Sequence, residues 1–235
     1  MIHIGLSGYS YKPWVGRFYP EGTKPDAYLA YYGTRFETVE MDGTWYRMPS
    51  EKAIETWLAN TPERFWFVPK AHRDITHKVR MKPDSYASMK FMLKRLDPMA
   101  KAGRLGPMLV QLPPNLKRDD ERLEGFLEGI PQDQRYAFEF RNDTWNCPEV
   151  LDLLRAKNAA WVGSETDQSD LVHHDTADFL YLRLRKLEYD DGALQAWADK
   201  FLAARQAGKE CFVFCKHEDE GAPWEWADRL RELTS

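Results

Sequence analysis

Strand-like segments alternate with helix-like segments along this chain, and this alternation limits the fold more than any other feature of the sequence. Short apolar runs recur at a spacing of roughly 30 residues, and helical periodicity follows most of them. The expected strands are residues 3–7, 38–42, 65–71, 108–112, 136–141, 159–163, 179–185 and 210–215. The expected helices are 25–36, one that begins at 50, 84–102, 119–129, 148–157, 191–207 and 223–233, and the helix between the sixth and seventh strands is missing or very short.

This order of elements predicts a TIM-like (β/α)8 barrel with a closed parallel sheet, which spans residues 1–235 as a single domain. A doubly wound sheet has the same alternation, but no Gly-x-Gly-x-x-Gly or P-loop pattern follows any expected strand. The barrel is therefore the predicted fold.

Composition and cysteine usage predict a soluble cytoplasmic protein with no membrane partner. The formal charge is −4, with 33 basic and 37 acidic residues, so no overall positive field favours non-specific binding to nucleic acid. Cys211 and Cys215 lie four positions apart on one expected strand, too far for a disulfide, so the three cysteines are expected to be free thiols. Met1 leads directly into a strand without a signal peptide, and no apolar run reaches the roughly 18 residues of a membrane span.

The parity of the expected strands places polar side chains inside the barrel. On the fifth strand Glu139 and Arg141 lie on one side, and Phe138 and Phe140 lie on the other. Because the apolar side of a barrel strand packs against the helices, the polar side faces the interior. The same rule predicts an interior ring of Glu40, Asp42, Lys70, Gln111, Glu139, Arg141 and Arg183, completed by Ser7 and Cys215, with His217 close beyond.

Two interpretations of this ring remain open. Buried charges cost several kcal/mol unless they are paired, so the ring could be a neutral ion network that fills the barrel. Alternatively, the ring is a binding pocket, in which Lys70, Arg141 and Arg183 outnumber Glu40 and Glu139 and favour an anionic or carbohydrate-like ligand. The ring lies near the carboxyl ends of the strands, where the active sites of barrel enzymes are built.

The candidate catalytic residues are Glu40, Glu139, Lys70 and His77. Two carboxylates whose pKa values are driven apart, one by burial and one by a nearby cation, can act as general acid and general base. The candidate ligand-binding residues are the remaining polar groups of the ring and the aromatic residues expected at the mouth: Tyr9, Asp42, Tyr46, Gln111, Arg141, Trp145, Arg183 and His217.

No cofactor is assigned. A divalent metal is a candidate, because Glu40, His72, His77, Glu139, Glu165 and His217 could converge from several strands. No metal ligand is predicted, because the sequence has no His-x-x-x-His or Cys-x-x-Cys spacing. A serine nucleophile is not predicted either, because Gly-x-Ser-x-Gly is absent.

The chain resembles the YecE-like family of domains of unknown function, the DUF-72 family. The resemblance covers nearly the whole chain and rests on residues 4–11, Trp14, 18–20, 39–40, 46–47, Pro49, 70–71, 76–77, 111–114, 139–141, Trp145 and 181–184. It implies a barrel with a polar mouth at the carboxyl ends of the strands, and it implies no particular reaction. Members usually carry Asn where Asp42 stands, His-Gly where residues 185–186 stand and Asn-Asn-Asp near residues 216–219, so a modified ligand is expected here.

Three functions follow from these observations. The first is an enzyme, for instance a hydrolase, lyase or isomerase, that acts by acid–base chemistry on a small anionic or sugar-like substrate at the barrel mouth. The second is a nucleic-acid-binding protein or a metal-dependent nuclease resembling the barrel-type DNA repair endonucleases, with Arg47 and Arg73 on phosphates. The third is a ligand-binding barrel without catalysis. The sequence gives no oligomeric state.

Overall fold

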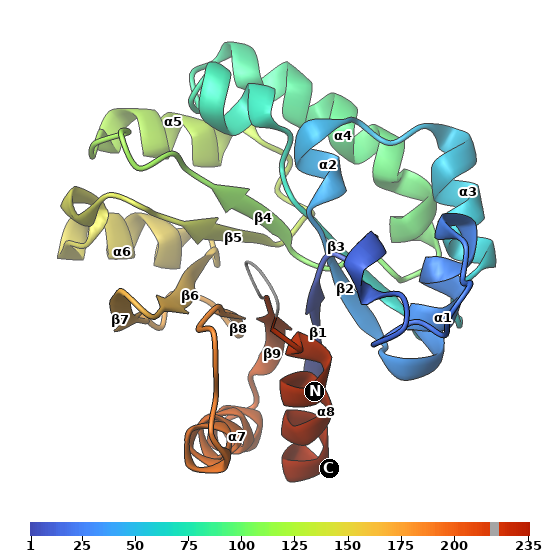
Figure 1. Cartoon of the computed structure of the whole chain (residues 1–235). Helices are drawn as coiled ribbons and strands as arrows, with labels where there is room; N and C mark the ends of the chain where they lie inside the picture. The colour runs from blue at the N-terminus through green and yellow to red at the C-terminus, as the bar shows by residue number, and fades with distance from the viewer. Residues whose placement is uncertain (217–220) are drawn as a thin grey trace.

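Eight parallel strands form a nearly closed barrel in the computed structural model, which describes residues 1–216 and 221–235 (Figure 1). The barrel strands are β1 (Ile2–Ser7), β2 (Thr38–Met41), β3 (Trp66–Pro69), β4 (Met108–Gln111), β5 (Tyr136–Glu139), β6 (Ala160–Thr166), β8 (Phe179–Leu184) and β9 (Glu210–Cys215). They pair in the order β3-β2-β1-β9-β8-β6-β5-β4. Isolated bridges from Phe67 to Leu105 and from Lys70 to Leu109 connect β3 with β4 and close the circle. The predicted TIM-like barrel is confirmed.

Helices surround the strands (Figure 1). They are α1 (Tyr28–Arg35), α3 (Glu51–Ala59), α4 (Asp84–Lys101), α5 (Asp120–Gly129), α6 (Pro148–Ala156), α7 (Asp191–Gln206) and α8 (Pro223–Thr234). Local sequence explains several starts, because the side chains of Ser50, Asp119 and Asp190 each accept a hydrogen bond from a backbone N–H of the first turn. No helix among the described residues is long and apolar enough to cross a membrane.

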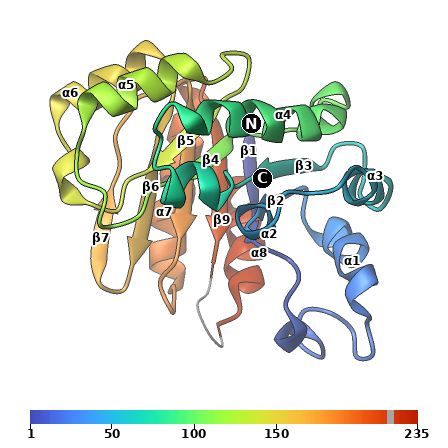
Figure 2. The ribbon, with the colours of Figure 1, turned by 90° about the horizontal axis from the view of Figure 1, so that it is seen from above.

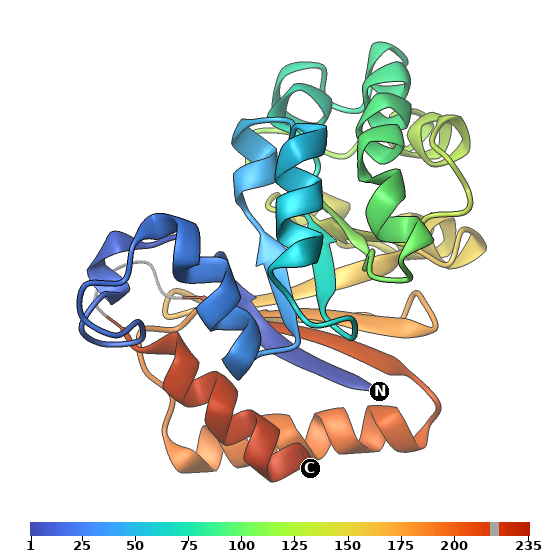
Figure 3. The ribbon, with the colours of Figure 1, turned by 90° about the vertical axis from the view of Figure 1, so that its right-hand side faces the viewer.

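Short elements complete the connections. The loop after β1 contains the turn η1 (Lys12–Trp14) and lies at the end of the barrel toward which the strands run (Figures 2 and 3). The turn η2 (Pro25–Ala27) precedes α1, and η4 (Asp143–Trp145) follows β5. The one-turn helix α2 (Gly43–Tyr46) and the π-helical turn η3 (Asp74–Lys78) occupy stretches for which the sequence predicted loops.

The predicted absence of a helix between the sixth and seventh barrel strands is confirmed. A short strand, β7 (Ser169–Val172), folds back antiparallel onto β6 instead. The chain then enters β8, which pairs in parallel with β6 from Val162 to Glu165.

The core has two layers, one on each side of the sheet. The outer layer lies between strands and helices and includes Val39, Phe138 and Leu182. The inner layer fills the barrel and consists of Val68, Leu109, Ala137, Ala160, Val162, Phe179, Tyr181, Phe212 and Phe214. The inner layer occupies the middle of the barrel, so the polar residues that follow it along the strands are held at the mouth.

A second cluster of polar side chains lies at the opposite end of the barrel. His3 Nε2 lies 2.7 Å from Glu210 Oε1, and the Arg135 guanidinium donates to Glu210 Oε2 at 2.5 Å. Both side chains pack on Phe212, with the His3 ring 4.7 Å from its centroid and Arg135 Cζ 5.1 Å from it. These side chains fill the barrel interior at this end.

Cys215 does not belong to the interior ring, which corrects the parity assigned to the last strand. Cys215 and Val213 lie in the outer layer of the core, whereas Phe212 and Phe214 point into the barrel. The interior needs bulky side chains to fill it, so β9 turns its aromatic side inward. The next inward position is Lys216.

Candidate functional site

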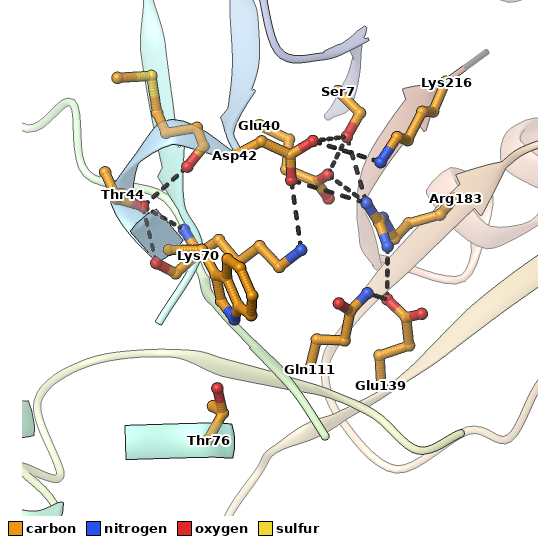
Figure 4. A network of polar contacts seen from close by, with 12 residues as sticks. Ser7, Glu40, Asp42, Thr44, Lys70, Thr76, Gln111, Glu139, Arg183 and Lys216 are labelled. Atoms are coloured by element: carbon orange, nitrogen blue, oxygen red, sulfur yellow. Dashed lines mark hydrogen bonds and ion pairs between the residues drawn. The ribbon is translucent and has the colours of Figure 1, made fainter. Parts of the chain in front are cut away.

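Arg183 is the centre of the polar site at the barrel mouth (Figure 4). It lies on β8 with no exposed surface, and its two terminal nitrogens contact two different carboxylates. One donates to Glu139 Oε2 at 2.6 Å, and the other donates to Glu40 Oε1 at 2.8 Å and to Ser7 Oγ at 3.2 Å. One guanidinium therefore joins β8 to β1, β2 and β5 across the barrel. Burial disfavours its charge, but Glu40 and Glu139 hold the Arg183 pKa well above its ordinary value.

Both glutamates have their oxygens occupied by donors from the protein. Glu40 accepts hydrogen bonds from the Tyr181 hydroxyl at 2.7 Å and from the Ser7 hydroxyl, in addition to Arg183. Glu139 accepts from the Gln111 amide at 2.8 Å and from Arg141 Nε at 3.0 Å. Burial would raise the Glu139 pKa, but Arg183 and Arg141 outweigh it and hold that pKa far below its ordinary value. Glu139 is therefore firmly ionised.

Asp42 is held between two lysines. Lys70 Nζ lies 3.5 Å from Asp42 Oδ1, and Lys216 Nζ lies 3.5 Å from Oδ2. The Ser7 hydroxyl also lies within hydrogen-bonding range of Oδ2, at 3.1 Å. Burial opposes ionisation of Asp42, but Lys70, Arg183 and Lys216 lower its pKa to about 2. Asp42 is thus an anion at neutral pH. Glu40, Asp42, Lys70, Glu139, Arg141, Arg183 and Lys216 are called the charged ring below.

Hydrogen bonds to the Lys70 backbone hold this residue in position. The Thr44 hydroxyl bridges the ends of β2 and β3, because it lies 2.7 Å from the Lys70 carbonyl and 3.0 Å from the Lys70 N–H. The Lys70 ammonium then lies over the Trp45 ring, 5.5 Å from its centroid. Burial lowers the Lys70 pKa from its ordinary value, and Asp42 only partly restores it.

His77 reaches the edge of the site through Trp45. Its Nδ1 lies 3.4 Å from Trp45 Nε1 and 2.8 Å from the Thr76 hydroxyl. Burial lowers the His77 pKa, and the nearby Lys70 and Arg141 charges lower it further, so the ring is neutral at pH 7.

An apolar cavity of about 660 Å³ adjoins the charged ring at Asp42. It lies between the loop after β1 and helices α2 and α3. Its wall includes polar residues such as Thr44 and Arg47 and a group of aromatic and thioether side chains: Tyr9, Tyr11, Met41, Tyr46, Met48 and Trp57. Two predicted ligand-binding residues, Tyr9 and Tyr46, are therefore brought together here beside Asp42.

A smaller and more polar cavity of about 280 Å³ adjoins the ring at Glu139. Arg141 and Arg185 line it together with polar side chains such as Asn142 and Ser164. The two cavities meet the ring on opposite sides of Arg183, which contacts Glu139 and lies 3.9 Å from Asp42.

Trp145 is not at the mouth, which corrects its prediction as a ligand-binding residue. Its side chain has no exposed surface, and its indole N–H donates to the Leu116 carbonyl at 2.7 Å. The ring stacks on Phe140 at 5.0 Å in the outer layer of the core. The short turn η4 directs the Trp145 side chain into the core, and strand parity does not predict the direction of a side chain in such a turn. His217, which was also predicted as a ligand-binding residue, lies outside the described residues.

The candidate metal ligands do not converge in the part of the chain that the structure describes, where no group of three His, Cys, Asp or Glu side chains could hold an ion. Glu165 lies on the helix side of β6, where it accepts from Trp197 Nε1 at 3.0 Å and lies 3.3 Å from Lys186 Nζ. Arg183 and its partners hold Glu40 and Glu139 apart from the histidines.

Two members of the site were missed in the sequence. Lys216 was missed because the last strand was assigned the wrong parity; alternation from Phe212 and Phe214 identifies it. Tyr181 shares the inward side of β8 with Arg183, but a tyrosine below a charged layer looks like core packing. Its hydroxyl, at the end of a buried ring, is the part that reaches Glu40.

Known proteins resemble this chain in both sequence and structure. The family model described as "Protein of unknown function DUF72" matches residues 3–235. The UPF0759 protein YunF of Bacillus subtilis is 29% identical over 180 residues, a match that covers 73% of this chain and 62% of that protein's length, less than two thirds of it.

Solved structures of DUF72 family proteins also resemble this chain. A DUF72 family protein from Thermotoga maritima is 26% identical, with a TM-score of 0.87 over 99% of this chain and 98% of the other. A DUF72 family protein from Enterococcus faecalis is 18% identical and shares the fold, with a TM-score of 0.81 over 100% of this chain and 95% of the other. With a family model that matches nearly every residue, this chain belongs to the DUF72 family of proteins of unknown function.

Proposed function

We propose that the barrel mouth binds a small anionic substrate and that Lys70 and Asp42 carry out acid–base chemistry on it. The observation that carries this proposal is the composition of the charged ring, in which four basic side chains surround three carboxylates. Arg185 lines the adjoining polar cavity. Within the charged ring itself the basic side chains outnumber the carboxylates by one, and an anion would neutralise that difference.

Lys70 is a ring cation whose ion pair leaves it able to contact a ligand. It is 8% exposed, and its distance of 3.5 Å to Asp42 exceeds the roughly 2.7–2.9 Å of a strong charge-assisted hydrogen bond. Its ammonium therefore keeps hydrogen-bonding capacity for a substrate. A lowered pKa also favours proton transfer near neutral pH, because an acid or base works best when its pKa lies near the working pH.

Glu40 and Glu139 have a positioning role in this proposal. All four of their carboxylate oxygens accept hydrogen bonds from protein donors, so neither has a lone oxygen aimed at a substrate. They orient Arg183 and compensate its charge. Asp42, whose side chain is 17% exposed, is the most exposed of the three ring carboxylates; it lines the apolar cavity and lies 3.5 Å from Lys70 Nζ.

A phosphate titration of the full chain tests this proposal. We expect inorganic phosphate to bind, and Lys70→Met to weaken binding at least about tenfold, because a hydrogen bond to a charged group contributes roughly 1.5–3 kcal/mol. Arg141→Gln should weaken it by a smaller factor, since the Arg141 side chain is 34% exposed and water screens it. Isothermal titration calorimetry measures both effects.

Lys101→Met is the matched control, because Lys101 lies on α4 with a side chain that is 77% exposed and should not affect phosphate binding. If phosphate failed to bind, or bound equally well to Lys70→Met, the ring would be a structural ion network and the proposal would be wrong.

A further inference from the structure

We infer that the apolar cavity beside Asp42 is a second subsite of the same pocket, which takes a planar aromatic group attached to the anion. This inference rests on the proposed function for the anionic part of the ligand. It specifies the class of substrate, an aryl or heteroaryl compound that bears a phosphate or a similar small anion.

The size of the cavity shows that a small anion alone would leave it unfilled. Its volume of about 660 Å³ lies within the range of roughly 300–1,000 Å³ that is typical of pockets for whole small molecules. Of the charged ring, only Asp42 lines this cavity. A ligand that uses both regions therefore has a charged part and an apolar part.

The wall of the cavity is suited to a flat ring. Tyr9, Tyr46 and Trp57 present aromatic surfaces, and Met41 and Met48 present polarisable thioethers, which pack favourably against aromatic groups. Tyr46 is 64% exposed on the one-turn helix α2, so its ring has apolar surface that a ligand would cover. Covering such surface is the main source of affinity in pockets of this kind.

A sugar ring is a poorer match for this cavity, because the exposed wall is more apolar than polar, although Ser10 and Arg47 also line it. Two other polar side chains of the wall are engaged within the protein: the Thr44 hydroxyl contacts the Met41 and Lys70 carbonyls, and the Ser50 hydroxyl accepts from the Ala53 N–H at the start of α3. A sugar needs a hydrogen-bond partner for each buried hydroxyl, whereas an aromatic ring does not.

The two parts of the ligand would meet at Asp42. Asp42 lines the apolar cavity, and its carboxylate lies within 3.9 Å of Lys70, Lys216 and Arg183. An aromatic group in the cavity thus has its polar substituent next to the cations of the charged ring.

Four probes test the inference by calorimetry on the full chain: inorganic phosphate, phenol, phenyl phosphate and glucose 6-phosphate. We expect phenyl phosphate to bind at least about tenfold more tightly than phosphate, since burial of roughly 60 Å² of apolar surface is enough for that factor. Tyr46→Ala and Trp57→Leu should lower this ratio toward one. Phe91→Ala, which removes an aromatic side chain that is 49% exposed on α4, should leave the ratio unchanged.

The outcomes separate the inference from the proposed function. Phosphate binding with no gain for phenyl phosphate overturns the aromatic subsite and leaves the anion site intact. Glucose 6-phosphate binding as tightly as phenyl phosphate also overturns the aromatic subsite. Binding of phenol in the Tyr46-dependent cavity without binding of phosphate supports the subsite and overturns the proposed anion site.

Discussion

Replacement of Arg183 by leucine is expected to lower the free energy of unfolding by about 3–5 kcal/mol, one of the two largest effects predicted for a single substitution in this chain. The guanidinium has no exposed surface and compensates both Glu40 and Glu139, which are also buried. Without it, two carboxylates would stay in the barrel with their main counter-charge removed. Urea denaturation followed by circular dichroism measures the loss.

Two further variants make this result specific. Arg64→Leu removes an arginine whose side chain is 76% exposed, and its effect should stay within about 0.5 kcal/mol. Combining Arg183→Leu with Glu40→Gln and Glu139→Gln should recover part of the loss, because no uncompensated charge remains in the barrel. A loss below about 1 kcal/mol for Arg183→Leu alone would contradict the central role of this residue.

Trp145→Ala is expected to destabilise the protein by about 3–5 kcal/mol, as is typical when a large buried aromatic side chain is removed. Trp145 has no exposed surface, and the substitution would also leave the Leu116 carbonyl without its indole donor. Thermal and urea denaturation measure the effect.

Trp145→Phe separates a packing role from ligand binding. It should be less destabilising than Trp145→Ala and should bind phosphate like the unmodified chain, because the residue lies in the outer core layer and not at the mouth. Phe91→Ala provides an exposed aromatic control with an effect within about 0.5 kcal/mol. Weaker phosphate binding in a fully folded Trp145→Phe variant would show that Trp145 contributes to the anion site.

Strand parity predicted most of the charged ring, because it depends only on local geometry. In β2, β4, β5 and β8, and at the residue that follows β3, an apolar residue on one side and a polar residue on the other leave a single arrangement in a barrel whose outer face is covered by helices. Glu40, Lys70, Gln111, Glu139 and Arg183 all lie inward and are buried, as this rule requires. The closure of the barrel and the missing helix before β8 were also predicted from element spacing.

The rule failed where both faces of a strand are apolar or where the chain leaves the strand. In β9 both faces are buried, so alternation alone does not tell Phe214 from Cys215, and the need to fill the barrel decided in favour of Phe214. Beyond the strand ends, side-chain directions depend on single turns such as α2 and η4, which placed Asp42 beside Lys216 and turned Trp145 into the core. The apolar cavity arises from packing of three separate segments, and no local pattern in the sequence reveals it.

Titration of the Lys70 ε-amino group by NMR, without and with inorganic phosphate, tests the anion site most directly, with Lys70→Met used to assign the signal. Burial lowers the Lys70 pKa, and a bound anion stabilises the protonated form. The pKa should therefore lie below its ordinary value without phosphate and rise when phosphate is added, and phosphate affinity should fall as pH rises through the Lys70 pKa. A Lys70 pKa that is at or above its ordinary value and does not respond to phosphate would contradict an anion site at the barrel mouth.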